Sequence, residues 1–153
     1  MSSNCPKSEW RRTLARALVL GGGLAMLAAP VSALARKAAK KPPALYTAAQ
    51  AATGQALYGG ECAVCHGATL EGRVAPALRG AQFANAKSDF AIADVFLVIA
   101  QQMPAGKPGS LPQADYAAIM AYLLQQNGYP AGSKLLTYEE ASTSNVALIY
   151  SGP

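Results

Sequence analysis

The sequence predicts an all-α domain in which a few helices are wrapped by glycine- and proline-rich loops. No run alternates apolar and polar residues over several positions, so the signal for strands is poor. Three stretches instead carry apolar residues at helical spacing, and Gly/Pro-rich segments over about 67–82 and 103–109 separate them. These helices offer too little core for the loops that they carry. We therefore expect something other than side chains to fill the middle of the domain.

Residues 1–35 are predicted to be a cleaved signal peptide. A flank of lysine and arginine precedes the apolar run Ala17–Ala29, and a small-residue site follows at Ala33–Ala35. This order is typical of secretory signals, with cleavage after Ala35, and it predicts a periplasmic protein. The alternative is an uncleaved membrane anchor, for which the run is shorter than the span of about 20 residues that a bilayer needs. Cys5 precedes the apolar run and would leave with the signal.

The chain after residue 35 is expected to have three parts: a flexible basic, proline-containing leader over 36–46, a domain over 47–136 and a C-terminal extension over 137–153. The net charge of the whole chain is +5, but much of it belongs to the signal and the leader. From Pro42 onward, five basic residues stand against seven acidic ones, a net charge of −2. A nucleic-acid-binding protein carries a dense basic patch, so this class is excluded.

The first expected helix runs from about Thr47 to Gly59 and is ended by Gly59-Gly60. The second covers about Asp89–Gln102, with Ser88 or Asp89 as its N-cap. It ends near Gln102 because Pro104 pushes the residue before it out of the helical region.

The third expected helix follows a capping box formed by Ser110 and Gln113, with Pro112 in the first turn. Gly128 closes it as a C-cap. One apolar face is expected on this helix, made of Tyr116, Ile119, Met120, Leu123 and Leu124.

The stretch GECAVCHG places Cys62, Cys65 and His66 within five positions, and His66 is the only histidine of the chain. A structural zinc site needs four ligands, and no second pair remains after signal removal. A thioredoxin-like dithiol needs a βαβ context, and a plain disulfide leaves the histidine without a role. Covalent attachment of one haem c uses all three residues, with a thioether from each thiol and His66 on the iron. We therefore predict a haem site.

A second axial ligand decides what such a haem does, because iron with two protein ligands mostly transfers electrons. With no second histidine, a methionine is the natural candidate. Met120 lies on the apolar face of the third helix and is expected to be a core side chain. Met103 lies where the second helix stops, directly before Pro104 and a loop that brings its side chain inward. We predict Met103 as the ligand; the alternative is that it packs the end of the helix.

Four segments together resemble single-haem class I cytochromes c: GQALYGGECAVCHG, APALRG, QQMPAGKPGSL and YAAIMAYLLQQNG. The similarity covers about residues 47–136. It implies a fold of three to five helices and Gly/Pro-rich loops around one covalently attached haem. Within class I, the region from Met103 onward resembles periplasmic cytochromes that serve pyrroloquinoline-quinone-dependent (quinoprotein) dehydrogenases.

The resemblance also implies roles for four further residues. In this family the helix before the attachment site crosses the last helix at a small residue, with aromatic rings beside it; Gly54, Tyr58 and Tyr122 match these positions. Pro76 matches the family proline whose carbonyl accepts a hydrogen bond from the other ring nitrogen of the ligand histidine. The lysine-rich haem face of mitochondrial-type cytochrome c is missing, so we expect an exposed haem edge surrounded by apolar and neutral residues.

We therefore expect a monomeric electron carrier, not an enzyme, between a dehydrogenase and a downstream cytochrome or terminal oxidase. Two alternatives stay open. The first is a haem subunit of a membrane-associated oxidoreductase complex, anchored by a retained N-terminal segment or by a partner. The second is a haem enzyme with an open iron position, such as a peroxidase or a nitrite-reducing protein. A gas sensor of the cytochrome c′ type is disfavoured. In that type the attachment motif lies near the C-terminus, whereas here it lies close to the start of the mature chain.

Overall fold

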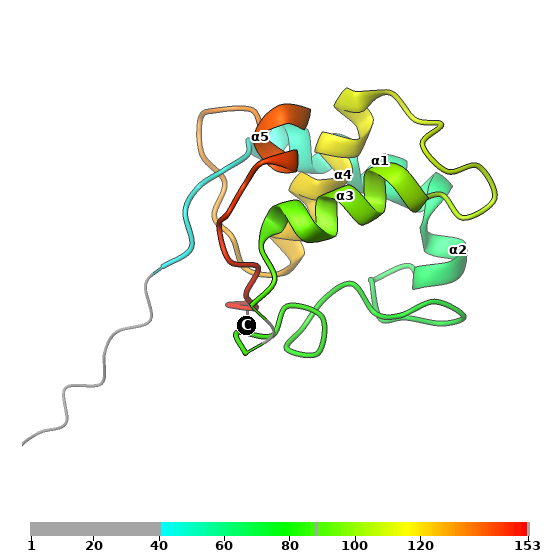
Figure 1. The fold of residues 1–153 in the computed structure, drawn as a ribbon, viewed down its shortest axis with the longest axis horizontal. Helices are drawn as coiled ribbons and strands as arrows, with labels where there is room; N and C mark the ends of the chain where they lie inside the picture. Colours follow the sequence, from blue (N-terminus) through cyan, green and yellow to red (C-terminus); the bar gives the residue numbers. More distant parts are fainter. Residues whose placement is uncertain (1–40, 88, 153) are drawn as a thin grey trace, which may run out of the picture. The chain divides into compact units, whose positions relative to one another are not determined.

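A computed structural model describes residues 41–87 and 89–152, and the structural statements below concern these residues. Five helices are present: α1 (Ala48–Glu61), α2 (Ala63–His66), α3 (Ile92–Gln102), α4 (Gln113–Gln126) and α5 (Tyr138–Ser142), shown in Figure 1. This part of the chain has no strand, only two isolated bridges, Thr47–Gly132 and Ala91–Ala147. The predicted all-α fold is confirmed. The expected signal peptide lies outside the described residues.

None of the helices within these residues is long and apolar enough to cross a membrane.

Helix α1 starts as predicted but ends later. The Oγ1 atom of Thr47 accepts a hydrogen bond from the N–H of Gln50 at 3.2 Å and caps the first turn. The prediction that Gly59-Gly60 ends the helix was wrong, since α1 continues to Glu61. Both glycines are exposed and cost about 1 kcal/mol each relative to alanine. The buried ring of Tyr58 and its carbonyl, which accepts from the Cys62 N–H at 2.9 Å, carry the helix past them.

Helix α3 begins three residues later than expected, so the prediction of a cap at Ser88 or Asp89 was wrong. The N-cap is Ala91, and the Oδ2 atom of Asp94 accepts a hydrogen bond from its N–H at 2.8 Å. The predicted end is confirmed. Met103 follows Gln102 with extended backbone angles, φ −119° and ψ 155°.

Helix α4 forms the centre of the core, because every residue from Tyr116 to Leu124 is buried. The predicted capping box at Ser110 was wrong: Pro112 is the N-cap, no side chain caps the helix, and Ser110 is exposed. The C-terminal end follows the prediction. Gly128 has a positive φ of 89°, and Gly128 and Tyr129 donate hydrogen bonds to the carbonyls of Gln125 and Leu124, respectively. This pattern is a Schellman motif.

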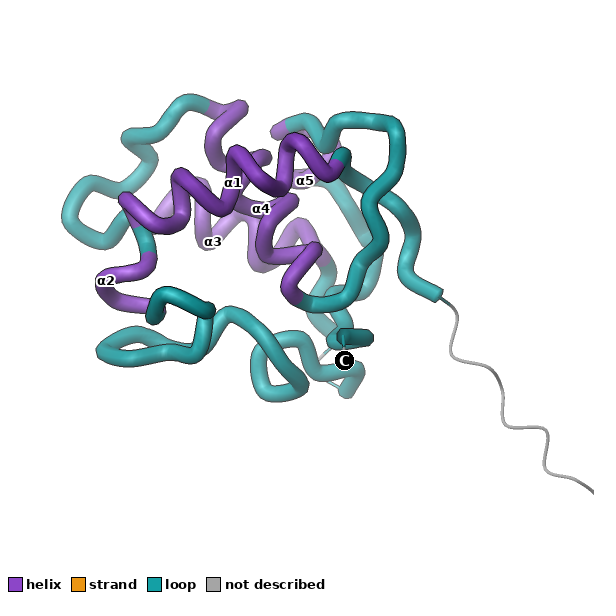
Figure 2. Tube along the Cα trace, turned by 180° about the vertical axis from the view of Figure 1, so that it is seen from behind, coloured by secondary structure: helices purple, strands orange, loops and turns teal. Residues whose placement is uncertain are grey.

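Helices α1 and α4 cross in close contact, as Figures 1 and 2 show from opposite sides. A Cβ atom built on Gly54 would lie 1.8 Å from the carbonyl oxygen of Ala118, so only glycine permits this approach. The rings of Tyr58 and Tyr122 pack beside the crossing, with their centroids 5.4 Å apart. The structure therefore confirms the roles expected for these residues.

The C-terminal segment packs back onto the start of α3 (Figure 1). The Ile92 N–H donates to the carbonyl of Val146 at 2.8 Å, and the Leu148 N–H donates to Phe90 at 2.7 Å. Leu148 is fully buried, and the ring of Tyr138 on α5 meets that of Phe96 edge to face at 5.0 Å. The segment after residue 136 therefore contributes to the same core as the helices.

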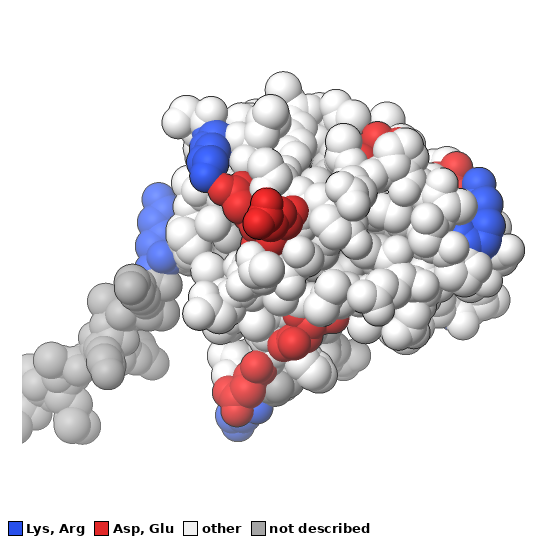
Figure 3. All heavy atoms as spheres, turned by 45° about the horizontal axis from the view of Figure 1, so that its top comes forward, with Lys and Arg blue, Asp and Glu red and all other residues white. Residues whose placement is uncertain are grey.

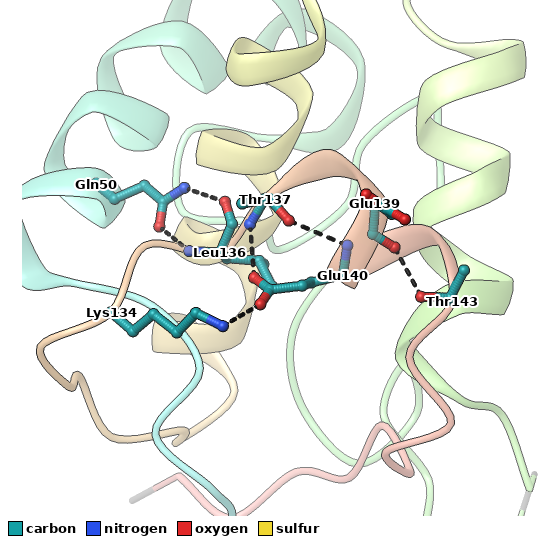
Figure 4. Close-up of polar contacts among 7 residues, drawn as sticks. All are labelled: Gln50, Lys134, Leu136, Thr137, Glu139, Glu140 and Thr143. Atoms are coloured by element: carbon teal, nitrogen blue, oxygen red, sulfur yellow. Dashed lines mark hydrogen bonds and ion pairs between the residues drawn. The ribbon is translucent and has the colours of Figure 1, made fainter.

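Polar contacts fasten the beginning of this segment to α1 (Figure 4). The side-chain amide of Gln50 both donates to the Leu136 carbonyl at 2.7 Å and accepts from its N–H at 2.9 Å. Thr137 and Glu140 form a reciprocal capping box at the start of α5, and Lys134 is paired with Glu140. These contacts fix where α5 begins.

Candidate haem site

The two cysteines and the histidine lie on one helical turn. Cys62 separates α1 from α2, and its carbonyl accepts the N–H of His66 at 3.0 Å. Cys62 and Cys65 are three residues apart and therefore share one face of the turn. Both are half-buried free thiols. Burial, and then the neighbouring Glu61 and Cys65, raise the pKa of Cys62 to about 11. The Cys62 thiol is therefore protonated at neutral pH.

The imidazole of His66 is oriented by the backbone of Pro76. The Nδ1 atom lies 2.7 Å from the Pro76 carbonyl oxygen. Because a carbonyl only accepts hydrogen bonds, Nδ1 is the donor in this contact, and in the neutral ring Nε2 then has a lone pair that is available to a metal. The loop is held in place by hydrogen bonds from Ala75 N–H to the Cys65 carbonyl at 3.1 Å and from Gly72 N–H to the His66 carbonyl at 2.8 Å. This is the contact that the resemblance implies for Pro76.

A cavity of about 570 Å³ brings the predicted site residues together. It is lined by Cys62, Cys65, His66, Pro76 and Met103. Most of the remaining wall is apolar and comes from the loop before α3 and from α3 and α4; it includes Leu78, Phe83, Val95, Ile99, Ile119 and Leu123. The volume lies within the range of about 300–1,000 Å³ that is typical of ligand sites. Two thiols, an imidazole with a free nitrogen and a thioether around one apolar space suit a covalently bound haem.

The two methionines occupy different environments. Met103 lies at the C-cap of α3, is half-buried and lines the cavity. Met120 is fully buried within α4 and is not one of the residues that line the cavity. The structure therefore brings Met103, and not Met120, together with the attachment residues.

The edge of the cavity carries little charge. Exposed apolar side chains, Val74, Phe90 and Val98, contribute to the lining. Of the carboxylates that line the cavity, Glu61 pairs with Lys107 at 3.0 Å and Asp94 accepts the Ala91 N–H. On the face drawn in Figure 3, charged side chains cover a small part of the surface and lie in a few separate groups. These features agree with the expected apolar and neutral surroundings.

Sequence reasoning missed two side chains that fasten the loops around the cavity. The hydroxyl of Tyr116 donates to the Met103 carbonyl at 2.7 Å. The amide of the fully buried Asn127 donates to the carbonyls of Leu78 and Leu123 at 3.0 and 2.8 Å, and its Oδ1 atom accepts from Gly80 N–H at 3.0 Å. The signal available for Asn127 was a polar residue directly after an apolar helix. Tyr116 was correctly placed on the apolar face, but nothing in the sequence indicated the partner of its hydroxyl.

Comparison with known proteins also shows similarity to cytochromes c. Residues 49–123 match the family model described as cytochrome c oxidase, cbb3-type, subunit III. A chain from the crystal structure of the sulfane dehydrogenase SoxCD of Paracoccus pantotrophus is similar at 30% identity and a TM-score of 0.51, over 64% of this chain. The match spans about half, 52%, of the SoxCD chain. No curated protein matches the sequence. The described residues are therefore similar to cytochrome c domains, and the five helices and the Cys-x-x-Cys-His turn beside an apolar cavity agree with this similarity.

Proposed function

We propose that this chain is a periplasmic c-type cytochrome that carries single electrons from a dehydrogenase to a downstream cytochrome or terminal oxidase. The observation that carries the proposal is that Cys62, Cys65, His66 and Met103 line one apolar cavity. When bound, haem c supplies an Fe(III)/Fe(II) couple that takes up and releases one electron. Because Met103 would close the iron to other ligands, we infer that the chain acts as a carrier and not as an enzyme. A quinoprotein dehydrogenase is the proposed donor, on the resemblance of the region from Met103 onward.

Each site residue has a defined part in this proposal. Cys62 and Cys65 would hold one haem through thioethers, and His66 and Met103 would be its axial ligands. The Pro76 carbonyl keeps the proton on Nδ1 of His66 and raises the basicity of the ligand nitrogen. The apolar wall limits the access of water. Such a wall and a neutral thioether both favour the less charged reduced state, so we expect a high potential.

The periplasmic location rests on the N-terminal sequence. A basic flank, an apolar run and a small-residue site within residues 1–35 support export and cleavage after Ala35. The mass of the purified protein tests this. A chain of residues 36–153 that behaves as a monomer would agree with a free carrier, whereas retention of residues 1–35 would contradict it.

A subunit of an oxidoreductase complex is the second candidate. Two observations favour it: the matching family is described as an oxidase subunit, and the similar structure is that of a sulfane dehydrogenase. Co-purification of a second chain at equal stoichiometry from the native membrane or periplasm would support this candidate. Isolation of the chain alone, reduced by an added dehydrogenase, would support the carrier.

The axial ligand is tested by a pair of methionine variants. Met103→Ala is expected to open the iron, lower the potential and allow carbon monoxide to bind the reduced protein, because the thioether that lines the cavity is removed. Met120→Leu is expected to leave the spectrum unchanged, because Met120 only packs within α4. The measurements are the Met–iron absorption band, a redox titration and carbon monoxide binding. Opening by Met120→Leu instead would transfer the ligand role to Met120.

A further inference from the structure

The loop that carries Met103 is held at both ends by one side chain of α4. The hydroxyl of Tyr116 donates a hydrogen bond to the Met103 carbonyl at 2.7 Å and accepts one from the Leu111 N–H at 3.3 Å. A hydroxyl has one donor and two acceptor positions, so both bonds form together. Tyr116 is only 2% exposed and lies in the buried run of α4. The loop from 103 to 111 is therefore pinned to the centre of the core at its beginning and at its end.

The other hydrogen bonds of this loop are local, and its ion pair is exposed. The Met103 carbonyl also accepts the Gly109 N–H at 3.2 Å, and the Lys107 N–H donates to Pro104 at 2.9 Å. The Lys107–Glu61 pair links the loop to α1, but Lys107 is 58% exposed and such surface pairs contribute little. The Met103 N–H continues the ladder of α3 by donating to Ile99 at 3.2 Å. Tyr116 is thus the buried side chain that ties the loop to α4.

We propose that Tyr116 is a positioning residue for the Met103 thioether. This inference rests on the proposed function, because it takes Met103 as an axial ligand. A metal ligand on a loop stays in place only when neighbouring hydrogen bonds hold its backbone. Tyr116 fixes the carbonyl of Met103 itself and the far end of the loop, which leaves the thioether on the cavity side. Loss of the hydroxyl would loosen the hold on the Met103 backbone, and the thioether would then be held less firmly in the cavity.

Tyr129 offers a matched control. Its hydroxyl donates to the Ala147 carbonyl at 2.5 Å and accepts from the Ile149 N–H at 3.0 Å, so it makes the same pair of bonds. It is 3% exposed, almost the same as Tyr116. It holds the C-terminal segment, however, and is not one of the residues that line the cavity. A Tyr→Phe change at either position therefore removes one donated and one accepted hydrogen bond. Only the change at Tyr116 removes a hydrogen bond to Met103.

The test compares Tyr116→Phe and Tyr129→Phe in the full chain with its haem attached. Both variants are expected to lower the midpoint of thermal unfolding. Only Tyr116→Phe is expected to raise the affinity of the reduced protein for carbon monoxide, by about three- to tenfold, since one hydrogen bond corresponds to a factor of this size. The Met–iron band should also weaken at a lower temperature in this variant than in Tyr129→Phe.

Equal carbon monoxide affinities in the two variants, together with an opened iron in Met103→Ala, would overturn the positioning role and leave the proposed function intact. An unchanged iron in Met103→Ala would overturn the proposed ligand itself. Should Tyr116→Phe fail to accumulate, hydrogen exchange of the wild-type protein tests the same contact. The Leu111 amide is then expected to exchange as slowly as the amides of α4, and exchange as fast as in the exposed loop would contradict the inference.

Discussion

At the scale of single residues, Gly54 sets the distance between the two helices of the core. The Cβ atom of any other residue would lie 1.8 Å from the Ala118 carbonyl oxygen, and this obstacle is backbone that cannot rotate away. We expect Gly54→Ala to lower the free energy of unfolding by about 3 kcal/mol, because the helices must separate. Chemical denaturation of the protein measures this loss.

Gly59→Ala is the matched control for that substitution. Gly59 lies on the same helix, and a Cβ atom there would meet nothing within 4 Å. We expect this variant to be more stable than the wild type, by up to about 1 kcal/mol, because alanine favours the helix. Similar effects at both positions would show that propensity, and not close approach, decides the stability at Gly54.

Individual residues also show what could be predicted about the site. Cys62, Cys65 and His66 could be predicted as haem-binding residues because their spacing along the chain is itself the chemical requirement, and all three line the cavity. Met103 was singled out by its place before Pro104, at the end of a helix, and it lines the cavity. Tyr116 and Asn127 were missed because their partners are backbone groups of loops, and loop paths are not encoded in local patterns.

At the scale of elements, the predicted helices were right in type and less accurate at their ends. The apolar spacing of α3 and α4 reflects burial, which the sequence displays directly. The ends depend on competing local effects. Gly59 and Gly60 continue α1 because the packing of Tyr58 outweighs their poor propensity. Ser110 does not cap α4, since Pro112 takes that place and the loop from Met103 is bound to Tyr116 instead.

Helix α5 was not predicted, and its start depends on a carboxylate. Glu140 accepts the N–H of Thr137 at 3.1 Å and is paired with Lys134 (Figure 4). The hydrogen bond from Lys134 and then that from the Thr137 N–H hold the pKa of Glu140 below its ordinary value. The ionised form therefore favours the folded state. The contribution of the ionised Glu140 to the free energy of unfolding is complete above the ordinary pKa of 4.5. It is lost as the pH falls through the lower pKa that this group has in the folded state.

Glu140→Gln tests this dependence. The amide cannot titrate, so we expect a slightly lower unfolding temperature than the wild type at pH 7 and a smaller further loss between about pH 5 and pH 3. Thermal unfolding followed by circular dichroism measures both. Glu139→Gln is the control, because Glu139 is exposed and its carboxylate lies outside the capping box. The same pH profile in both variants would contradict the role of Glu140.

At the scale of the whole molecule, the helices and loops surround an apolar cavity of about 570 Å³. Several of its lining side chains, Val74, Phe90 and Val98, are exposed, so water can reach the apolar wall. Contact between apolar surface and water is unfavourable, so a bound group that covers this wall stabilises the folded state. The expectation from sequence that something other than side chains fills the middle thus has an energetic reason.

Removal of the attachment residues tests this dependence. A protein with both Cys62→Ala and Cys65→Ala is expected to lose fixed tertiary packing whenever haem is not retained. Near-ultraviolet circular dichroism measures that loss, and a cooperative transition in the haem-free variant would contradict it. Val64→Ala is the control. Val64 lies between the two cysteines and is 74% exposed, so this variant should keep the wild-type near-ultraviolet spectrum.

The scarcity of charge around the cavity has a consequence for encounters with redox partners. A cavity edge that is lined mostly by apolar side chains, with Glu61 paired to Lys107, exerts little long-range attraction. Association would then proceed at the unsteered rate of roughly 10⁵–10⁶ M⁻¹s⁻¹, limited by how often apolar rims meet in the right orientation. Such a rate hardly changes with ionic strength. The chain would exchange electrons at the same pace in dilute and in saline surroundings.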